Sequence, residues 1–481
     1  DPAVASRFAD CKPMNILGVD PSVATPDGYA YAIGTSSWEA ETTQDIVALS
    51  LTGVAFELPA GPVDFAVGAE YREEELTLDS NADPALLDTP EEYNERFNGL
   101  RGVASSALFY WLNNVGVADG DRDVTEVFVE LNVPLLSGVP GAQNLDLNAA
   151  WRWTDYSTSG DVDTWKVGLQ WRPIDDILVR VAQSTDIRAP SLYDMFAGRS
   201  SAIGTFYDPV TDFQTNIQQA SGGNPNLSPE ESDTFTAGFV WTPGFVDGLS
   251  LSVDYYSLEV DDAIDSLTGQ QIINNCYNYG GVECSLITRP DPNSFPTSIF
   301  LTKANIATLE VSGLDIDLTY STDAIGPGQF SARLYMNHLM KYETQLYQGA
   351  PVIDYVGIAE ADSVPEGRPE WTGLLSLSYQ LGDLGIHLTE QYIHSVEVGL
   401  PGTNSYFIED DVDAVWYTDL TVTYDVAAGD GSIQLFGTVN NLFDEDFPLI
   451  PATVPGVNMP TTISVYDTIG RAFTVGMRFD F

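Results

Sequence analysis

The sequence predicts an all-β protein, a transmembrane antiparallel up-and-down β-barrel. Apolar and polar residues alternate along segment after segment of the chain, as in strands whose two faces meet different surroundings. Very short and very long connections alternate between these segments, which is typical of outer-membrane barrels. A soluble meander or propeller would explain the alternation. It would not explain the aromatic residues at segment ends, which resemble interfacial girdles, at Trp151, Trp153, Trp171, Trp241, Tyr255, Trp371, Tyr379 and Tyr424.

We expect about fifteen strands, from a first strand at 42–58 to a last one that ends at Phe481. Single-chain bacterial barrels have an even number of strands, so this odd number implies further strands outside the sequence. In one segment the apolar parity slips at Ser312 and Gly313, which predicts a β-bulge. The clearest alternating segments are 63–71, 145–153, 165–171, 235–241, 249–255, 371–379, 418–424 and 473–481.

The connections fall into two classes, which we expect at opposite rims of the barrel. The short ones contain the Gly, Pro and Asp residues that favour turns, at 59–62, 137–143, 173–176, 243–248, 325–329, 382–385 and 427–431. In outer-membrane barrels, short turns face the periplasm and long loops face the outside. We expect the long loops at roughly 79–123, 189–229, 262–302, 346–366, 398–411 and 446–466.

The composition excludes some classes of function. The formal net charge is -51, from 70 acidic and 19 basic residues, and nucleic-acid binding needs clustered Lys and Arg instead. Disorder is excluded because 44% of the residues are hydrophobic and 11% are aromatic. The acidic residues therefore cover a folded surface, for solubility alone or as an adaptation to a saline habitat.

The chain has three cysteines, at positions 11, 276 and 284. Cys276 and Cys284 are close in sequence, and Gly280 and Gly281 between them can form the tight turn that a disulfide needs. Such a disulfide implies an oxidising compartment. The alternative is that both are metal ligands, although no nearby His or third Cys completes a zinc site. Cys11 is left without a partner.

We expect no catalytic site, cofactor site or dedicated metal site. The three histidines are His338, His387 and His394, and a strand would place His387 on the opposite face from Glu390 and His394. No phosphate-binding or dinucleotide-binding loop is present. Acidic loops such as DGDRD at 119–123 could hold Ca²⁺, but this pattern is unspecific.

Four segments in series resemble the C-terminal signature segments of TonB-dependent outer-membrane receptors. They are STDIRAPSLYDMF (184–196), GGNPNLSPEESDTFTAGFVWTP (222–243), GTVNNLFDEDF (437–447) and the closing GRAFTVGMRFDF (470–481). The resemblance implies a 22-stranded barrel with a plugged lumen. Residues 42–481 would be its C-terminal part, with residues 1–41 a remnant of an extracellular loop and the N-terminal plug and first strands missing.

The same resemblance implies an integral protein of the outer membrane of a Gram-negative bacterium. Phe479 and Phe481 would belong to the aromatic C-terminal signal for outer-membrane assembly. The implied partners are outer-membrane lipid and lipopolysaccharide, and the TonB–ExbB–ExbD complex, which would act through the missing N-terminal part. The function would be energy-coupled uptake of a scarce nutrient without covalent chemistry.

We expect the ligand to bind the outer loops, where aromatic residues cluster beside Asn and Asp. Such a surface suits an oligosaccharide, although loop packing alone would give the same composition. The acidic loops favour a neutral or cationic small molecule. Alternatives are a siderophore or cobalamin receptor, a passive porin, or a barrel-type hydrolase. The candidate binding residues are Phe109, Tyr110, Trp111, Phe206, Tyr207, Phe213, Tyr277 and Tyr279.

Overall fold

The computed structural model describes residues 12, 14, 25–32, 34–82, 115–280, 282–345, 347, 350–359, 367–399, 411–429, 431–450, 461–462 and 464–480. An antiparallel sheet of 16 strands dominates these residues. Its two-residue strand β15 (Ile353–Asp354) pairs only with β14, which leaves fifteen strands along the main path of the sheet. The predicted fold class and the predicted number of about fifteen strands are therefore confirmed.

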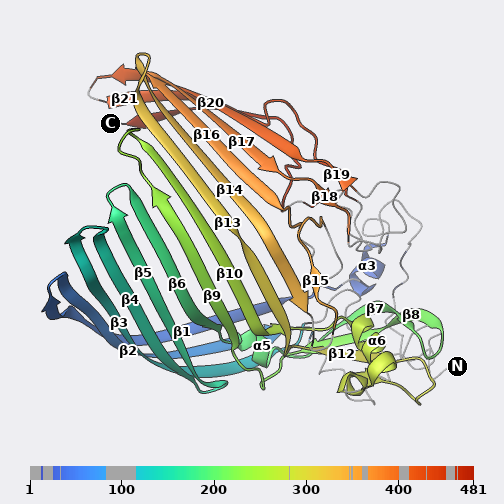
Figure 1. Cartoon of the computed structure of the whole chain (residues 1–481). Coiled ribbons are helices and arrows are strands. Elements are labelled where there is room, and N and C mark those ends of the chain that lie inside the picture. The colour runs from blue at the N-terminus through green and yellow to red at the C-terminus, as the bar shows by residue number, and fades with distance from the viewer. Residues whose placement is uncertain are drawn as a thin grey trace.

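The fifteen main strands lie side by side in chain order (Figure 1). The strand numbers missing from this series belong to β15 and to the strands of two smaller sheets. The main strands are β1 (Trp38–Leu58), β2 (Gly61–Ser80), β3 (Ala118–Val139), β4 (Ala142–Tyr156), β5 (Gly160–Ile174), β6 (Ile177–Arg188), β9 (Glu230–Trp241), β10 (Leu249–Asp265), β13 (Ala304–Ile325), β14 (Gly328–Gln345), β16 (Trp371–Leu381), β17 (Leu384–Ile393), β20 (Val415–Ala428), β21 (Gly431–Asn440) and β22 (Ala472–Asp480).

The short turns lie where the sequence predicts them. Each predicted turn joins two neighbouring strands of the sheet, as Leu58 of β1 and Gly61 of β2 illustrate. The predicted bulge is also present, because the register between β13 and β14 shifts between Ser312 and Gly313. We call the rim formed by these turns the short-turn rim and the opposite one the long-loop rim.

The predicted bounds of the long loops vary in accuracy, and the loop at 189–229 fits between the end of β6 and the start of β9. The expected loop at 79–123 begins and ends within strands, because β2 continues to Ser80 and β3 already starts at Ala118. A further connection at the long-loop rim, residues 157–159 between β4 and β5, is as short as the turns of the other rim. Before β1, the helix α3 (Pro26–Ala32) is the first described element.

The main sheet has one apolar face and one polar face. On β22, Phe473, Val475 and Met477 share the apolar face and are largely exposed. Tryptophans of β4 and β5 lie exposed on the same face of the sheet, at Trp151, Trp165 and Trp171. A soluble protein seldom exposes so large a continuous apolar surface, whereas a membrane barrel turns such a surface toward lipid.

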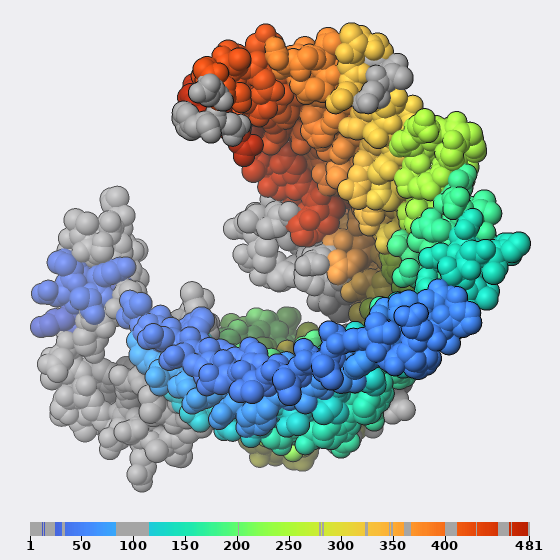
Figure 2. Space-filling view, turned by 90° about the vertical axis from the view of Figure 1, so that its left-hand side faces the viewer, coloured from blue at the N-terminus to red at the C-terminus, as the bar shows by residue number. Residues whose placement is uncertain are grey.

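The sheet curls into an open trough. Figure 2 shows a C-shaped body with β1, in blue, along one edge and β22, in red, at the other. In the described part of the chain, the path of paired strands ends at these two strands. Two hollows, of about 730 Å³ and 360 Å³, open on the polar face, which is therefore the concave one.

A separate small sheet lies at the long-loop rim (Figure 1). It has the order β11 (Ile287–Thr288), β12 (Ser298–Thr302), β8 (Phe213–Gly222) and β7 (Ser200–Asp208), with β8 and β12 parallel. The helix α6 (Gly269–Tyr279) and the 3₁₀ helix η2 (Val282–Leu286) contact it. We call residues 200–222 and 267–302 the cap module. Its buried core consists of Phe206, Ile217, Ile272, Ile273 and Ile299.

A second small sheet, of β18 (Val396–Glu397) and β19 (Asp411–Val412), lies near the ends of β17 and β20. Its valines pack into a cluster with the buried side chains of Ile393, Tyr417 and Tyr466. Within the described ranges, no helix is long and apolar enough to span a membrane.

Candidate functional site

The concave face near the long-loop rim carries a network of ion pairs. Arg72 of β2 contacts Glu70 and Glu74 at 2.8 Å each, and Glu74 also pairs with Arg122 of β3. Glu126 of β3 pairs with Arg152 of β4 at 3.3 Å, which extends the network to β4. These side chains occupy alternate positions of their strands, so the strand period places them all on the concave face.

A short segment crosses the mouth of the trough at this network. We call residues 189–199 the strap; it contains the helix α5 (Leu192–Phe196), whose N-cap Ser191 forms a capping box with Asp194. Arg122 donates a 2.7 Å hydrogen bond to the Pro190 carbonyl oxygen. Leu192 and Met195 of the strap share a hydrophobic core with side chains of three strands and of the segment before β9. These are Leu76 and Leu78 of β2, Ala118 of β3, Ile264 of β10, and Leu227. The strap therefore ties two distant parts of the sheet together.

The root of the strap is fixed by a second ion pair. Arg188, the last residue of β6, makes two 2.5 Å hydrogen bonds to Glu230, the first residue of β9. Glu230 also accepts the backbone N–H of Ile264 at 2.6 Å. Farther along the strap, Asp194 pairs with Lys303 at 2.9 Å. The strap is thus held by charged groups at its beginning and in its middle.

A glycine makes room for an ion pair in the middle of the concave face. Arg180 of β6 and Asp254 of β10 form two hydrogen bonds, of 2.7 Å and 2.6 Å, across the intervening strand β9. Gly238 of β9 is the residue paired with both of them. A Cβ atom at this position would lie 2.0 Å from the Asp254 carboxylate. Only glycine allows the two charged side chains to meet here.

Carboxylates neutralise several cations of the concave face. Farther along the sheet, Arg333 pairs with Asp317 at 2.7 Å. Lys341, which lies between Glu310 at 2.5 Å and Glu343 at 3.1 Å, is on the opposite face, because the register pairs it with Ser312. The arginines named on the concave face thus all have carboxylate partners. An anionic ligand would have to compete with these carboxylates, whereas a neutral or cationic ligand would not.

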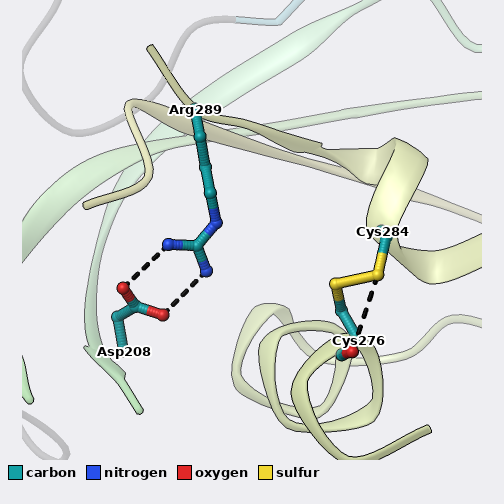
Figure 3. The surroundings of a disulfide bond; sticks show 4 residues. All are labelled: Asp208, Cys276, Cys284 and Arg289. Carbon is teal, nitrogen blue, oxygen red and sulfur yellow. Dashed lines mark hydrogen bonds and ion pairs between the residues drawn. A yellow bond between two sulfur atoms is a disulfide. The ribbon is translucent and has the colours of Figure 1, made fainter. Parts of the chain in front are cut away.

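The cap module is held together by a disulfide and a buried ion pair (Figure 3). Cys276 of α6 and Cys284 of η2 form the disulfide that the sequence favours, with Cα atoms 4.9 Å apart. Arg289 makes hydrogen bonds of 2.7 Å and 2.8 Å to the two oxygens of Asp208. Asp208 belongs to the connection between β6 and β9, and Arg289 belongs to the connection between β10 and β13. The ion pair therefore joins these two segments of the chain.

The environment of Asp208 makes the ion pair sensitive to acid. Burial by itself raises the pKa of the Asp208 carboxyl, but the Arg289 guanidinium and the Thr211 hydroxyl outweigh burial and hold this pKa below its ordinary value. A depressed pKa in the folded state contributes stability above the unfolded-state pKa of about 3.9. That contribution is lost as the pH falls through the folded-state pKa.

We therefore expect the cap module to lose stability as the pH is lowered below about 4. The measurement is near-ultraviolet circular dichroism of the chain in detergent during heating, at pH 6, 4 and 3. Asp208→Asn should remove most of the difference between these pH values, because this variant has no carboxyl at position 208. An unchanged unfolding curve of the original chain from pH 6 to 3 would contradict the expectation.

Reduction of the disulfide should destabilise the cap module without affecting the main sheet. The two cysteines are separated by 8 residues, and closing so short a loop stabilises a fold by about 2 to 3 kcal/mol. Hydrogen exchange of the α6 amides, with and without a reducing agent, measures this loss. The β4 and β5 amides are the internal control, and equal protection of α6 in both states would contradict the prediction.

The predicted aromatic residues do not form one surface. Phe206 is a core residue of the cap module, with its ring between Gly204 and Gly269, so its assignment as a ligand contact was wrong. Tyr207, Phe213 and Tyr277 are exposed on the module. Tyr279 belongs to α6, but its side chain lies outside the described residues. Phe109, Tyr110 and Trp111 also lie outside the described residues, as do Cys11 and Phe481.

The expected acidic loop at 119–123 is part of strand β3. Its residues alternate between the two faces of the sheet, and Arg122 pairs with Glu74 instead of facing its acidic neighbours. The strand period places Asp119, Asp121 and Asp123 on one face of the sheet, with successive Cα atoms about 7 Å apart, instead of in a loop that wraps around an ion. Among the described residues, no three His, Cys, Asp or Glu side chains gather in a way that could hold a metal ion.

The histidines make local polar contacts. His387 lies 2.7 Å from the Ser378 hydroxyl and 3.1 Å from the Thr389 hydroxyl. His394 contacts the Tyr392 hydroxyl at 2.6 Å, while Glu390 accepts a hydrogen bond from Thr418. The structure thus places His387, His394 and Glu390 in three separate interactions, as the strand period indicates.

The charged residues of the concave face are not among those predicted from the sequence. Arg72, Glu74 and Arg122 share the polar parity of their strands with Glu126 and Arg152. A search for Arg and Glu residues at the same parity of successive strands would have found them. By contrast, Phe479 is exposed on the apolar face of the last strand, where the alternation predicts it.

Comparison with known proteins gives a consistent result. The protein-family model described as "TonB dependent receptor-like, beta-barrel" matches residues 19–442. Among solved structures, the siderophore receptor PirA from Acinetobacter baumannii aligns with a TM-score of 0.59 and 15% identity over 92% of this chain. A ferric enterobactin receptor from Pseudomonas aeruginosa, PfeA, in complex with enterobactin aligns with a TM-score of 0.57 and 17% identity over 92% of this chain.

The matched structures are considerably longer than this chain. The alignments cover 55% of the Acinetobacter baumannii receptor and 54% of the Pseudomonas aeruginosa receptor. The siderophore receptor PirA from Pseudomonas aeruginosa aligns with a TM-score of 0.51 and 16% identity, over 92% of this chain and 57% of its own length. At these identities, the structural similarity shows the shared fold.

Proposed function

This chain belongs to the TonB-dependent receptor-like β-barrel family, and we propose that it is part of an outer-membrane receptor that imports a scarce nutrient with energy supplied through TonB. The observation that carries the proposal is the two-faced sheet. Its apolar face suits contact with lipid, and its polar concave face carries ion pairs and lies beneath the strap. The proposed location is the outer membrane of a Gram-negative bacterium, with the long-loop rim facing outward.

The proposed partners follow from this placement. The apolar face would contact outer-membrane lipid, and the cap module would lie at the level of lipopolysaccharide. Coupling to the TonB–ExbB–ExbD complex would use a part of the protein that is not in this sequence. The match to the receptor family favours a selective receptor over a passive porin.

We propose a ligand that is neutral or cationic. The titles of the matched structures describe siderophore receptors, which supports an iron chelate as one candidate. The paired arginines of the concave face argue against a strongly anionic chelate. A chelate of low charge, cobalamin and a neutral oligosaccharide remain as substrate classes. No step of the proposed function requires covalent chemistry or a cofactor.

Uptake by cells with and without the gene for this chain tests the proposal. The labelled probes are a ferric siderophore of low charge, cobalamin and a neutral oligosaccharide. We expect that cells with the gene accumulate at least one probe, and that an uncoupler of the proton gradient abolishes this accumulation. Uptake that depends on the gene but not on the gradient would indicate a passive porin, and chemical conversion of a probe at the cell surface would indicate a hydrolase.

A further inference from the structure

Two exposed tyrosines lie near each other on the cap module. Tyr207, in β7, is 43% exposed, and Tyr277, in α6, is 57% exposed. The pKa of Tyr207 is raised first by its hydrogen bond to Asp212 and then by burial, and Tyr277 adds a smaller contribution. Helix α6 also packs against β7, so the two exposed tyrosines belong to neighbouring elements of the module.

The surroundings of Tyr207 hold this surface in a fixed geometry. The Gln270 side chain accepts the Tyr207 N–H at 3.0 Å and donates to its carbonyl oxygen at 2.9 Å, so α6 is joined to β7. The Tyr207 hydroxyl donates a 2.8 Å hydrogen bond to Asp212. Asp212 has a φ of 50°, an unfavourable conformation for a non-glycine residue. This turn conformation accompanies the contact of the Asp212 carboxylate with the Tyr207 hydroxyl.

Helical spacing brings amide groups to the same surface. Gln270, Asn274 and Tyr277 are separated by four and three residues in α6, which places them on one helix face. Gln270 donates a 3.0 Å hydrogen bond to the Asn274 side chain, which orients the amide of Asn274. The surface thus combines two ring faces with an amide and one carboxylate. We call Tyr207, Asp212, Asn274 and Tyr277 the tyrosine platform.

We propose that the tyrosine platform binds a neutral oligosaccharide at the outer end of the receptor, an inference that rests on the proposed function and names its ligand class. Sugar rings present C–H faces that pack on aromatic rings, and their hydroxyls pair with carboxylate and amide groups. Arg289, the single Lys or Arg in the sequence of the cap module, is already paired with Asp208. This pairing leaves no obvious partner for an anionic ligand.

The rigidity of the module supports this role. The segments that carry the two tyrosines are joined by the Asp208–Arg289 pair, and the disulfide at Cys276 directly precedes Tyr277 (Figure 3). The side chains of Ile272 and Ile273 anchor α6 in the core of the module. A platform that is already ordered loses little conformational entropy when a ligand binds. Two short-stemmed tyrosines also lose less than flexible side chains would.

Isothermal titration calorimetry of the whole chain in detergent micelles tests the proposal. The probes are maltohexaose, cellohexaose, xylohexaose and mannohexaose. We expect at least one of them to bind, and Tyr277→Ala to raise its Kd about 10-fold, as the loss of one stacking ring predicts. Tyr277→Phe keeps the ring and should bind like the original chain.

Phe245→Ala is the matched control, because Phe245 is an exposed aromatic residue at the short-turn rim, next to Trp241. It should leave the Kd unchanged. The proposal is overturned if no probe binds, or if Tyr277→Ala and Tyr207→Ala bind like the original chain. Near-ultraviolet circular dichroism shows that each variant is folded. Binding here needs no energy source, so its outcome is separate from that of the uptake experiment.

Discussion

Replacing Arg289 by alanine is expected to destabilise the cap module by about 3 to 5 kcal/mol, because it leaves a buried carboxylate without its partner. The Asp208 side chain is fully buried, and the Arg289 side chain is 14% exposed. The pair also joins the two long connections that form the module. We expect hydrogen exchange of the β7, β8 and β12 amides to accelerate accordingly, while β4 and β5 remain protected.

Arg333→Ala is the control for this prediction. Arg333 contacts both oxygens of Asp317 much as Arg289 contacts those of Asp208, but its side chain is 61% exposed. Solvent weakens such a pair, so we expect little change in hydrogen exchange near Arg333. Equal effects of the two variants would mean that burial does not determine the strength of the Asp208–Arg289 pair.

Arg122→Ala is expected to loosen the strap. Arg122 pairs with Glu74, donates a hydrogen bond to the Pro190 carbonyl oxygen and lies over the ring of Tyr156. Truncation removes all three interactions, and the Pro190 carbonyl is left without a charged donor. We expect a loss of about 2 to 4 kcal/mol in the local stability of α5. Hydrogen exchange of the α5 amides measures this change.

Arg152→Ala tests whether the effect is specific to the strap. Arg152 belongs to the same network, but its side chain is 48% exposed, compared with 9% for Arg122. Arg152 makes a single 3.3 Å contact with Glu126, and the expected loss is less than about 1 kcal/mol. Protection of α5 that is unchanged in Arg122→Ala would show that the hydrophobic core alone holds the strap.

The main sheet could be predicted because its signals are local. The last strand shows this well: alternation along 473–481 predicts both the strand and its apolar face, and the structure exposes Phe473 and Val475 on that face. The bulge at Ser312 and Gly313 is equally local, because an extra residue changes the parity within one segment. Neighbouring strands then pair in chain order, so no long-range information is needed.

The candidate site could not be predicted in the same way. The helix α5 has only five residues, and its position depends on a core shared with β2, β3 and β10. The cap module combines two segments that are far apart in the sequence, so Tyr207 and Tyr277 become neighbours only in the folded chain. Phe206 and Tyr207 are adjacent and both aromatic, and only the fold separates the core residue from the exposed one.

The parallel pairing of β8 with β12 has a consequence for the order of folding. Ser298 pairs with Gln218, and the chain between these two residues includes both strands of the β9–β10 hairpin. Most pairs of the main sheet instead join consecutive strands. Closing the larger loop costs more chain entropy before any contact repays it. We therefore expect the cap module to form late, after β9 and β10 have brought its two halves together. In refolding followed by pulsed hydrogen exchange, the β8 and β12 amides should gain protection after those of β9 and β10.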